Sequence, residues 1–170
     1  MKIGIMSDTH DRLDAVEKAI DLFNRKGVKH VLHAGDLVSP FVAPRFAKLK
    51  AKLHIVWGNN EGDREFIRVK FGEIGVAPLG NFAALELGGK KIALLHGMHE
   101  DVVNSLVKCG SYDVVVRGHN HRAEIVGGKT LLINPGEVCG YLTGRQTVAI
   151  LDLTKLEAEI VHLQPFFKSI

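Results

Sequence analysis

Short apolar runs that alternate with segments of helical spacing constrain the fold of this chain more than any other feature. The apolar runs at residues 2–6, 30–34 and 53–57 alternate with helical spacing at residues 13–23, 41–49 and 64–71. We expect Asp11 to cap the first helix and Gly27 to end it. Such strand–helix–strand alternation predicts parallel strands that are joined by right-handed crossovers.

The second half of the chain has a different pattern. Gly88-Gly89 separates two apolar runs and predicts a hairpin, and residues 102–109 have helical spacing. Short runs follow at residues 114–116, 123–126, 131–133, 148–153 and 159–163. We interpret this half as an antiparallel region added to an α/β core, with two sheets face to face and helices outside. At 170 residues, we expect a single domain, residues 1–170.

The composition excludes several classes of protein. A net charge of +3 and an aromatic content of 6% do not support a dedicated nucleic-acid surface. Two cysteines, Cys109 and Cys139, are too few for a disulfide framework and indicate a reducing compartment. Asp8 interrupts the first apolar run too early for a signal peptide, and the sequence has no apolar run of about 20 residues. We therefore expect a cytoplasmic protein that does not enter a membrane.

Five apolar runs end in side chains that can bind metals. The carboxyl ends of neighbouring strands in an α/β sheet meet at one edge, where ligands gather. We therefore expect these side chains to converge there, whereas His30, His33 and His54 lie within strands and are interpreted as structural. The converging candidates are Asp8, His10, Asp36, Asn59, His96, His119 and His121.

The number and type of these side chains narrow the chemistry. They offer only oxygen and nitrogen atoms, and seven ligands exceed the four of a tetrahedral ion. With one carboxylate shared, they suit two neighbouring divalent ions with positions left for water or substrate. Such pairs generate hydroxide near neutral pH and bind phosphoryl oxygens. Manganese, iron, nickel, cobalt and zinc all fit imidazole and carboxylate ligands.

Five ordered blocks carry a resemblance to a known family: Asp8-x-His10, Gly35-Asp36, Gly58-Asn59-Asn60-Glu61, His96-Gly97 and Gly118-His119-Asn120-His121. Their order and spacing resemble the signature of the calcineurin-like metallophosphoesterases. Small size and the stretch Ile133-Asn134-Pro135-Gly136-Glu137 are most similar to the compact YfcE-type phosphodiesterases. The resemblance implies an α/β fold, a four-layer αββα sandwich of two mixed β-sheets flanked by helices, with a dinuclear centre at one edge.

The resemblance also implies a role for each ligand. One ion is assigned to Asp8, His10, Asp36 and His121. The other is assigned to Asp36, Asn59, His96 and His119, so that Asp36 bridges the pair. A hydroxide between the ions then attacks the phosphorus of a small phosphodiester substrate, in line with the leaving oxygen.

The sequence departs from the family pattern beside the ligands. Asn60 stands where many members have a histidine, and an amide cannot act as a general acid. We expect Asn60 to contact a phosphate oxygen, and hydrolysis to be slow and to favour activated leaving groups. Glu61 is expected to orient its neighbours, while Met98 and Asn120 replace more usual residues. Gly136 and Glu137 are further, weaker candidates for contact with substrate.

Other readings stay open at this point. A catalytically weak binding scaffold is one, because the retromer scaffold subunit of this superfamily keeps the fold without efficient catalysis. A phosphomonoesterase or nucleotide hydrolase with the same centre is another. His99 is expected either to face substrate or to be structural, and His162 to lie at the surface or on an edge strand. Residues 165–167 (Pro-Phe-Phe) are expected to pack on the domain or at a subunit interface, and a homo-oligomer stays open.

Overall fold

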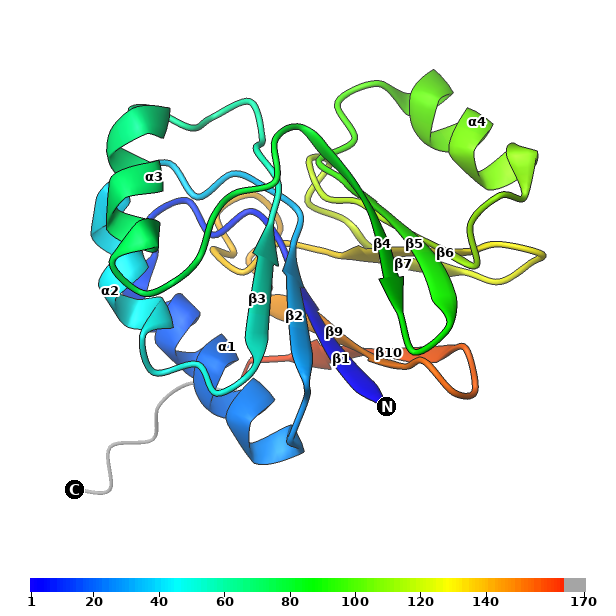
Figure 1. Ribbon diagram of the computed structural model, residues 1–170, viewed down its shortest axis with the longest axis horizontal. Helices are drawn as coiled ribbons and strands as arrows, with labels where there is room; N and C mark the ends of the chain where they lie inside the picture. The colour runs from blue at the N-terminus through cyan, green and yellow to red at the C-terminus, as the bar shows by residue number, and fades with distance from the viewer. Residues whose placement is uncertain (164–170) are drawn as a thin grey trace.

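The computed structural model describes residues 1–163, and their strands form two five-stranded sheets (Figure 1). The first sheet consists of β1 (Lys2–Met6), β2 (His30–His33), β3 (Lys52–Ile55), β9 (Thr147–Asp152) and β10 (Glu157–His162). Its strand order is β10–β9–β1–β2–β3. As the alternation of the first half predicts, β1, β2 and β3 are parallel.

The second sheet consists of β4 (Phe82–Leu87), β5 (Lys90–Leu95), β6 (Val114–Val116), β7 (Ala123–Val126) and β8 (Leu131–Pro135). Its order is β4–β5–β6–β8–β7, and the hairpin at Gly88-Gly89 joins β4 to β5 as predicted. The expectation of an antiparallel region holds for the pairs β4–β5 and β7–β8, but it is wrong for β5, β6 and β8, which are parallel to one another, so the sheet is mixed. The reason is visible in β6, where three consecutive valines are buried, as is typical of a central parallel strand.

Four layers result from the way the helices cover the sheets. The first sheet carries α1 (Leu13–Lys26), α2 (Ala43–Phe46) and α3 (Arg64–Gly72), while α4 (Glu100–Cys109) covers the second sheet (Figure 1). A 3₁₀ turn, Pro40–Val42, leads into α2. This arrangement confirms the αββα sandwich. Among the described residues, no helix has the length and apolar character needed to cross a membrane.

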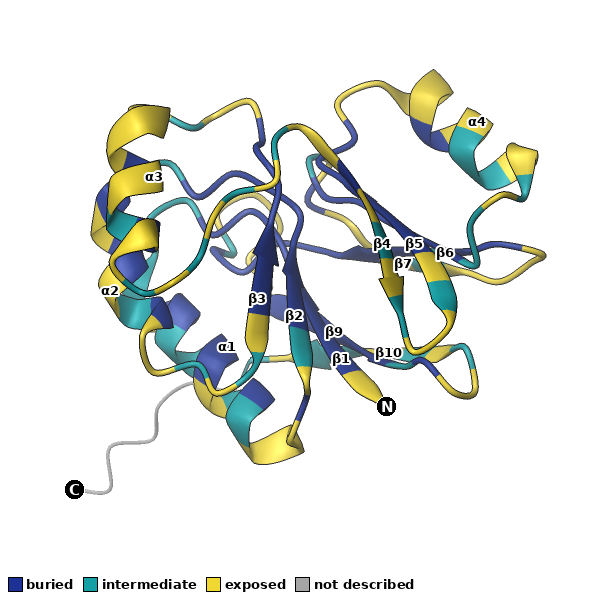
Figure 2. Ribbon diagram, viewed as in Figure 1, coloured by how far each residue is buried: buried dark blue, intermediate teal, exposed yellow. Residues whose placement is uncertain are grey.

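Three apolar clusters hold the layers together. One cluster lies between the sheets and includes Ile3 and Leu32 from the first sheet and Ile92 and Leu94 from the second, all fully buried. Another joins α1, α2 and α3 to the first sheet, and a smaller one joins α4 to the second. Both faces of the central strands are therefore buried (Figure 2), so polar side chains are confined to the strand ends and the loops after them.

The start of α1 differs from the sequence expectation. Asp11 does not cap the helix, because the residue before Leu13 is Arg12, which makes no side-chain cap. Asp11 has a positive φ of 53° and its Oδ1 accepts hydrogen bonds from the backbone N and the Oγ of Ser39, at 3.2 and 2.8 Å. The carboxylate thus fastens the loop after β1 to the loop after β2. Gly27 ends α1 in the left-handed conformation, as expected.

Candidate metal centre

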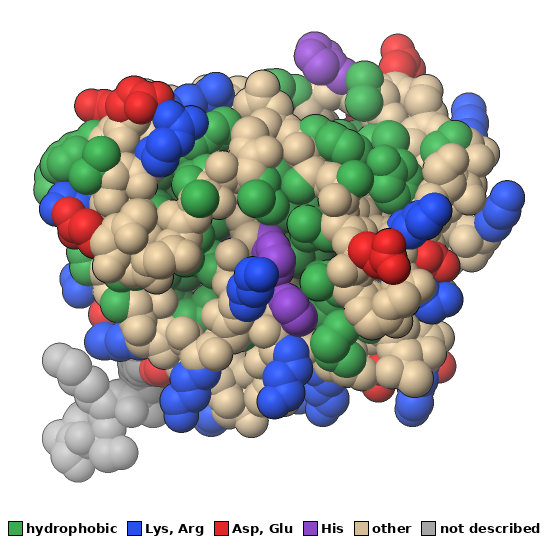
Figure 3. Space-filling view, in the orientation of Figure 1, with side chains coloured by type: hydrophobic (Ala, Val, Ile, Leu, Met, Phe, Trp, Pro, Cys, Tyr) green, Lys and Arg blue, Asp and Glu red, His purple; other side chains and the backbone are tan. Residues whose placement is uncertain are grey.

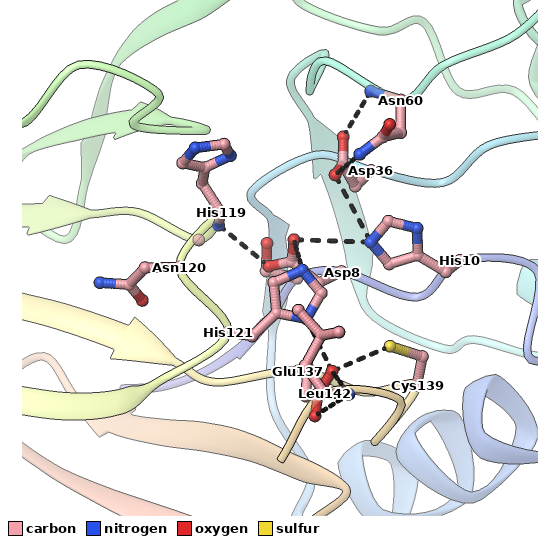
Figure 4. Close-up of polar contacts among 12 residues, drawn as sticks. Asp8, His10, Asp36, Asn60, His119, Asn120, His121, Glu137, Cys139 and Leu142 are labelled. Carbon is pink, nitrogen blue, oxygen red and sulfur yellow. Dashed lines mark hydrogen bonds and ion pairs between the residues drawn. The ribbon is translucent and has the colours of Figure 1, made fainter. Parts of the chain in front are cut away.

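The predicted ligands lie in loops that follow five parallel strands at one edge of the sandwich. Asp8 and His10 follow β1, Asp36 follows β2 and Asn59 follows β3. The second sheet contributes His96 after β5, and His119 and His121 after β6. Figure 4 shows how several of these side chains turn toward one another around Asp8 and Asp36. The structure thus brings the residues that the sequence singled out into one cluster.

Glycines allow these loops to approach so closely. Gly58 lies against Asp36, and a Cβ at this position would collide with the backbone N and the carboxylate of Asp36. Gly118 lies against Ser7 and Asp8, and a Cβ there would collide with both side chains. Larger residues at either position would therefore push apart two loops that carry ligands.

Backbone strain is concentrated in the same loops. Eight described residues other than glycine have a positive φ, and five of them are candidate ligands. Residues with side chains rarely adopt this conformation, which costs about 1 kcal/mol or more at each position. Strain that gathers at one cluster indicates selection for side-chain placement rather than for stability. The five are Asp8, His10, Asp36, His119 and His121, with φ between 40° and 74°.

Four of the side chains form what we call the Asp8 group: Asp8, His10, Asp36 and His121. His10 Nε2 lies 3.8 Å from Asp8 Oδ1 and 3.5 Å from Asp36 Oδ2. His121 Nε2 lies 3.4 Å from the same Asp8 oxygen. The side chains of Asp8 and Asp36 are buried, and those of His10 and His121 are mostly so. The donor atoms of Asp8, His10 and Asp36 all lie within 4.8 Å of one another, close enough to converge on one cation.

The other four candidates form the His96 group: Asp36, Asn59, His96 and His119. His96 Nε2 lies 3.4 Å from Asp36 Oδ2, and His119 Nδ1 lies 3.0 Å from Asn59 Oδ1. The rings of His96 and His119 are 5.1 Å apart. Since His96 is buried while Asn59 is exposed, this group links the interior to solvent. It offers a substrate a route to the carboxylate of Asp36.

Buried atoms without partners show that the cluster fits metal ions. Asp8 Oδ1, His10 Nε2 and His96 Nε2 are all buried, and none has a hydrogen-bond partner. Unpaired buried polar atoms are costly in proteins and call for an explanation. Carboxylate oxygens and imidazole nitrogens are the ligands that manganese, iron, nickel, cobalt and zinc accept. Cations bound among these atoms would give all three unpaired atoms a partner.

The charges of the cluster favour cations as well. The pKa of Asp36 is held below its usual range: burial acts against this, but the nearby imidazole of His96 and the hydrogen bonds from Asn60 outweigh burial. The nearby carboxylate of Asp8 raises the pKa of His10. Burial lowers the pKa of His96, but the nearby carboxylates of Asp36 and Asp8 outweigh it and raise that pKa. Protons therefore bind to these imidazoles where cations would bind, and the two compete.

Asn60 and Glu61 hold Asp36 in place. Asn60 donates to Asp36 from its backbone N, at 2.8 Å, and from its side-chain Nδ2, at 2.7 Å. Glu61 Oε1 accepts from the backbone N of Asp36 and from that of Gly58, both at 3.0 Å. The carboxylate of Glu61 therefore ties the loop after β2 to the loop after β3, in agreement with the orienting role expected for it. Burial raises its pKa.

Backbone and carboxylate acceptors fix the orientation of two ligand rings. His96 Nδ1 lies 2.7 Å from the carbonyl oxygen of Ala34, so Nε2 is the nitrogen that faces Asp36. His121 Nδ1 lies 2.6 Å from Glu137 Oε2, and Glu137 is fully buried behind the ring (Figure 4). A hydrogen bond from the ring nitrogen that does not bind metal sets the tautomer of a ligand imidazole and raises its basicity.

Arg117 is a structural residue that the sequence did not reveal. It is almost fully buried, and its guanidinium donates to the carbonyl oxygens of Gly97, at 2.9 Å, and Gly118, at 3.1 Å. It also pairs with Glu100 at the start of α4. One side chain thus joins the loop that carries His96 to the loop that carries His119. Arg117 directly precedes the block Gly118-His119-Asn120-His121, but only its three-dimensional contacts identify its role.

The remaining histidines are not candidate ligands, although His33 Nε2 lies 3.3 Å from Thr9 Oγ1 beside the cluster. His33 is buried and accepts from the backbone N of Gly35 at 3.1 Å, while His30 Nδ1 lies 3.0 Å from His54 Nε2. These contacts agree with the structural interpretation. His162 is exposed on β10, an edge strand, and His99 is exposed at the start of α4.

Gly136 and Cys139 lie deeper than substrate would reach. Gly136 is buried, and a Cβ there would collide with Thr147, so close packing explains the glycine. Cys139 is fully buried, its Sγ donates to Glu137 at 3.2 Å, and burial raises its pKa to about 12. Its sulfur lies within 4.8 Å of a nitrogen of His10 and of His121. As a neutral thiol, Cys139 packs against the cluster, as expected for a small apolar residue.

Comparison with known proteins decides the family. The family model for the calcineurin-like phosphoesterase superfamily domain matches residues 1–156. The chain belongs to the calcineurin-like phosphoesterase superfamily. It is 43% identical over 166 residues to phosphodiesterase MJ0936 of Methanocaldococcus jannaschii, a match that covers 96% of this chain and 100% of the relative. As a member of this superfamily, the protein is a hydrolase that acts on phosphoesters.

Solved structures show the same relationship. A structure described as that of a novel archaeal phosphodiesterase aligns with a TM-score of 0.91 and 42% identity, and covers 96% of this phosphoesterase and 100% of the other chain. The phosphoesterase YfcE of E. coli aligns with a TM-score of 0.68 over 96% of this chain and 100% of its own, at 19% identity. At that identity, the second likeness shows the fold alone.

Proposed function

We propose that this phosphoesterase is a metal-dependent phosphodiesterase that uses two divalent ions. The observation that carries the proposal is the position of Asp36 Oδ2, which lies 3.5 Å from His10 Nε2 and 3.4 Å from His96 Nε2. This one oxygen faces both ligand groups, as a bridging carboxylate must. Phosphodiesters are proposed as substrates because the relative with 43% identity is named a phosphodiesterase.

The ligands of the Asp8 group would hold one ion and those of the His96 group the other, with Asp36 common to both. When bound, such ions lower the pKa of water and neutralise phosphoryl oxygens. The chain itself places donors around the substrate. Asn59 and Asn60 are exposed at the rim, and Asn60 Nδ2, which donates to Asp36 here, is proposed to donate to a phosphate oxygen. His119 is half-buried beside Asn59 and completes this rim.

Metal content and activity of two variants test the two-ion assignment. Asp36→Asn removes the shared carboxylate and one negative charge, so we expect the purified protein to lose more than one ion per chain. His119→Ala removes a ligand of the His96 group alone, so we expect it to weaken mainly one ion. Metal per chain is measured by mass spectrometry after equilibration with manganese. Turnover is measured with bis(4-nitrophenyl) phosphate.

The outcomes separate this proposal from its rivals. Full activity and two bound ions in Asp36→Asn would refute the assignment of Asp36 as a bridge. A wild-type protein that binds both ions without turnover would indicate the binding scaffold, and faster turnover of 4-nitrophenyl phosphate than of the diester would indicate a phosphomonoesterase. Manganese, nickel, iron, cobalt and zinc are each assayed, because the donor set accepts all of them.

The free thiols of Cys109 and Cys139 support a proposed cytoplasmic location.

A further inference from the structure

An apolar pocket adjoins the metal centre and shares a residue with it. The pocket has a volume of about 290 Å³ and lies between α4, the start of β4 and the loops after β3 and β5. His96 is one of its lining residues, while His96 Nε2 faces Asp36 in the metal cluster. The pocket and the cluster are therefore neighbours that share this residue. We call it the His96 pocket, with apolar walls formed by Trp57, Phe82, Leu95, Met98, Val102 and Leu106.

The lining determines what the pocket can accept. Of the described residues that line it, none is Lys, Arg, Asp or Glu. Asn81 and His99 also line it and can donate hydrogen bonds, but a second phosphate or a carboxylate would lose its hydration there without gaining a Lys or Arg partner, which is costly. A cavity of about 150 Å³ holds benzene, so roughly twice that volume suits one substituted ring or two fused rings. The chemistry of the walls therefore favours an uncharged aromatic group.

The pocket is exposed, although its walls are hydrophobic. Phe82, Met98 and Val102 are 42%, 46% and 49% exposed. On the face drawn in Figure 3, hydrophobic side chains gather between the start of β4 and α4. Contiguous exposed apolar groups of this kind mark binding sites in soluble proteins. The continuity of the pocket with the metal cluster identifies the occupant as part of the substrate.

The walls are also held in place before anything binds. Trp57 is 5% exposed, and the guanidinium of Arg64 lies 5.6 Å from the centre of its ring. Arg64 Nη2 donates to the carbonyl oxygen of Gly58 at 3.0 Å, so the arginine fixes Trp57 relative to the loop that carries Asn59 and Asn60. A fixed aromatic wall reduces the entropy that binding would otherwise lose.

We propose that the His96 pocket binds an uncharged aromatic substituent of the phosphodiester and thereby sets substrate preference. This inference rests on the proposed function, because it assigns a specificity site to that reaction. It names a class of substrate: diesters that carry an aryl group or a nucleobase close to phosphorus, in contrast to diesters with small alkyl or charged substituents. Val102, Met98 and Phe82 are the specificity residues that it identifies.

Two substrates with one leaving group provide the test. Phenyl 4-nitrophenyl phosphate and methyl 4-nitrophenyl phosphate both release 4-nitrophenolate, so they differ only in the group that the pocket would bind. We expect kcat/KM to be about tenfold or more higher for the phenyl diester, since partial burial of a ring is worth that much. Val102→Glu introduces a charge at the pocket, and we expect the ratio to fall toward one. Val102 lies in the first turn of α4, where a glutamate is compatible with the helix.

Val126→Glu is the matched control, because Val126 is 45% exposed on β7 and does not line the pocket. We expect it to leave the ratio unchanged. A second readout does not depend on turnover. Trp57 is the only tryptophan of the chain, so its fluorescence reports on the pocket. We expect phenylphosphonate to shift this emission at lower concentration than methylphosphonate, and Val102→Glu to abolish the difference.

The outcomes distinguish failure of the inference from failure of the proposed function. Hydrolysis of neither diester would refute the function. Hydrolysis of both with equal kcat/KM would leave the function standing and overturn the inference. Equal kcat/KM together with a dimer that Val102→Glu dissociates, measured by light scattering, would show instead that the pocket is an interface between copies, and would overturn it too.

Discussion

Glu137 Oε2 lies 2.6 Å from His121 Nδ1 and fixes the ring so that His121 Nε2 faces Asp8. Glu137 also accepts from Thr143 Oγ1 and from the backbone N of Thr143 and Leu142. Burial opposes ionisation, but these hydrogen bonds, led by the one from His121, lower the pKa of Glu137 to about 2. The carboxylate is therefore ionised near neutral pH and makes His121 a stronger ligand.

Replacing this carboxylate tests its role. We expect Glu137→Gln to weaken binding of one ion by about 10- to 100-fold, the usual effect of losing a partner of a ligand histidine. Manganese binding is measured by isothermal titration calorimetry. Glu124→Gln is the control, because Glu124 is exposed on β7. An affinity equal to that of the wild type would show that Glu137 does not orient His121.

Arg117 should contribute to stability as well as to the site. Arg117→Met keeps much of the buried volume but leaves the carbonyl oxygen of Gly97 without its donor, whereas that of Gly118 keeps Asn120 N and Asn134 Nδ2. We expect a loss of about 1–3 kcal/mol in the free energy of unfolding, the usual cost of one unsatisfied buried group. Urea denaturation measures it. A change below 0.5 kcal/mol, which is about the usual effect of a surface substitution, would contradict this prediction.

Two glycines provide a matched pair of substitutions. Gly118→Ala places a Cβ against Ser7 and Asp8, and we expect it to reduce metal affinity and to destabilise the fold. Gly127→Ala adds the same methyl group where the structure places nothing within 4 Å, so we expect little change or a slight gain in stability. Thermal unfolding with and without manganese measures both. Similar results for the two variants would show that the tight approach of these loops is not required.

Two buried histidines predict how stability depends on pH. Burial lowers the pKa of His54 to about 4 and that of His33 to about 3. Unfolding returns each pKa to about 6.5, so the unfolded chain binds more protons between pH 6.5 and these values, and stability falls as pH falls through this window. At pH 5 we expect His54 alone to cost about 1–2 kcal/mol relative to pH 7.

His54→Gln should remove that part of the pH dependence. The free energy of unfolding in urea is measured at pH 7 and pH 5 for both proteins, with a chelator present so that bound metal does not contribute; the ligand histidines titrate alike in both proteins. We expect a smaller loss between the two pH values in the variant. An equal loss would show that His54 does not titrate in this range.

Asn60 leads to a prediction about leaving groups. Its side chain donates to Asp36 but has no proton to transfer as a general acid. We expect aryl diesters to react much faster than dialkyl diesters, and Asn60→His to raise turnover of dialkyl diesters by about tenfold or more. Steady-state kinetics with both classes measure this. Equal wild-type rates on the two classes would refute it.

The sequence was sufficient to single out the candidate ligands that the structure brings together, and Glu61 beside them, but not the supporting roles of Glu137 and Arg117. Each candidate ligand follows an apolar run within a few residues. Because the ends of neighbouring parallel strands meet at one edge, this position predicts that Asp8, Asp36 and His96 lie close together. Glu137 could not be found in this way, because the second half was interpreted as antiparallel. Once β6 and β8 are known to be parallel, His121 and Glu137 must follow strands that end at the same edge. Arg117 depends on contacts between loops, which no local pattern encodes.

The seven candidate ligands are divided between the two sheets. Asp8, His10, Asp36 and Asn59 follow strands of the first sheet, and His96, His119 and His121 follow strands of the second. Ions bound there would connect the two sheets. Metal affinity would then be thermodynamically linked to the free energy with which one sheet packs on the other. By linkage, if a core substitution between the sheets weakens metal binding, the lost binding free energy must equal the difference between the destabilisation that the substitution causes with metal and without it.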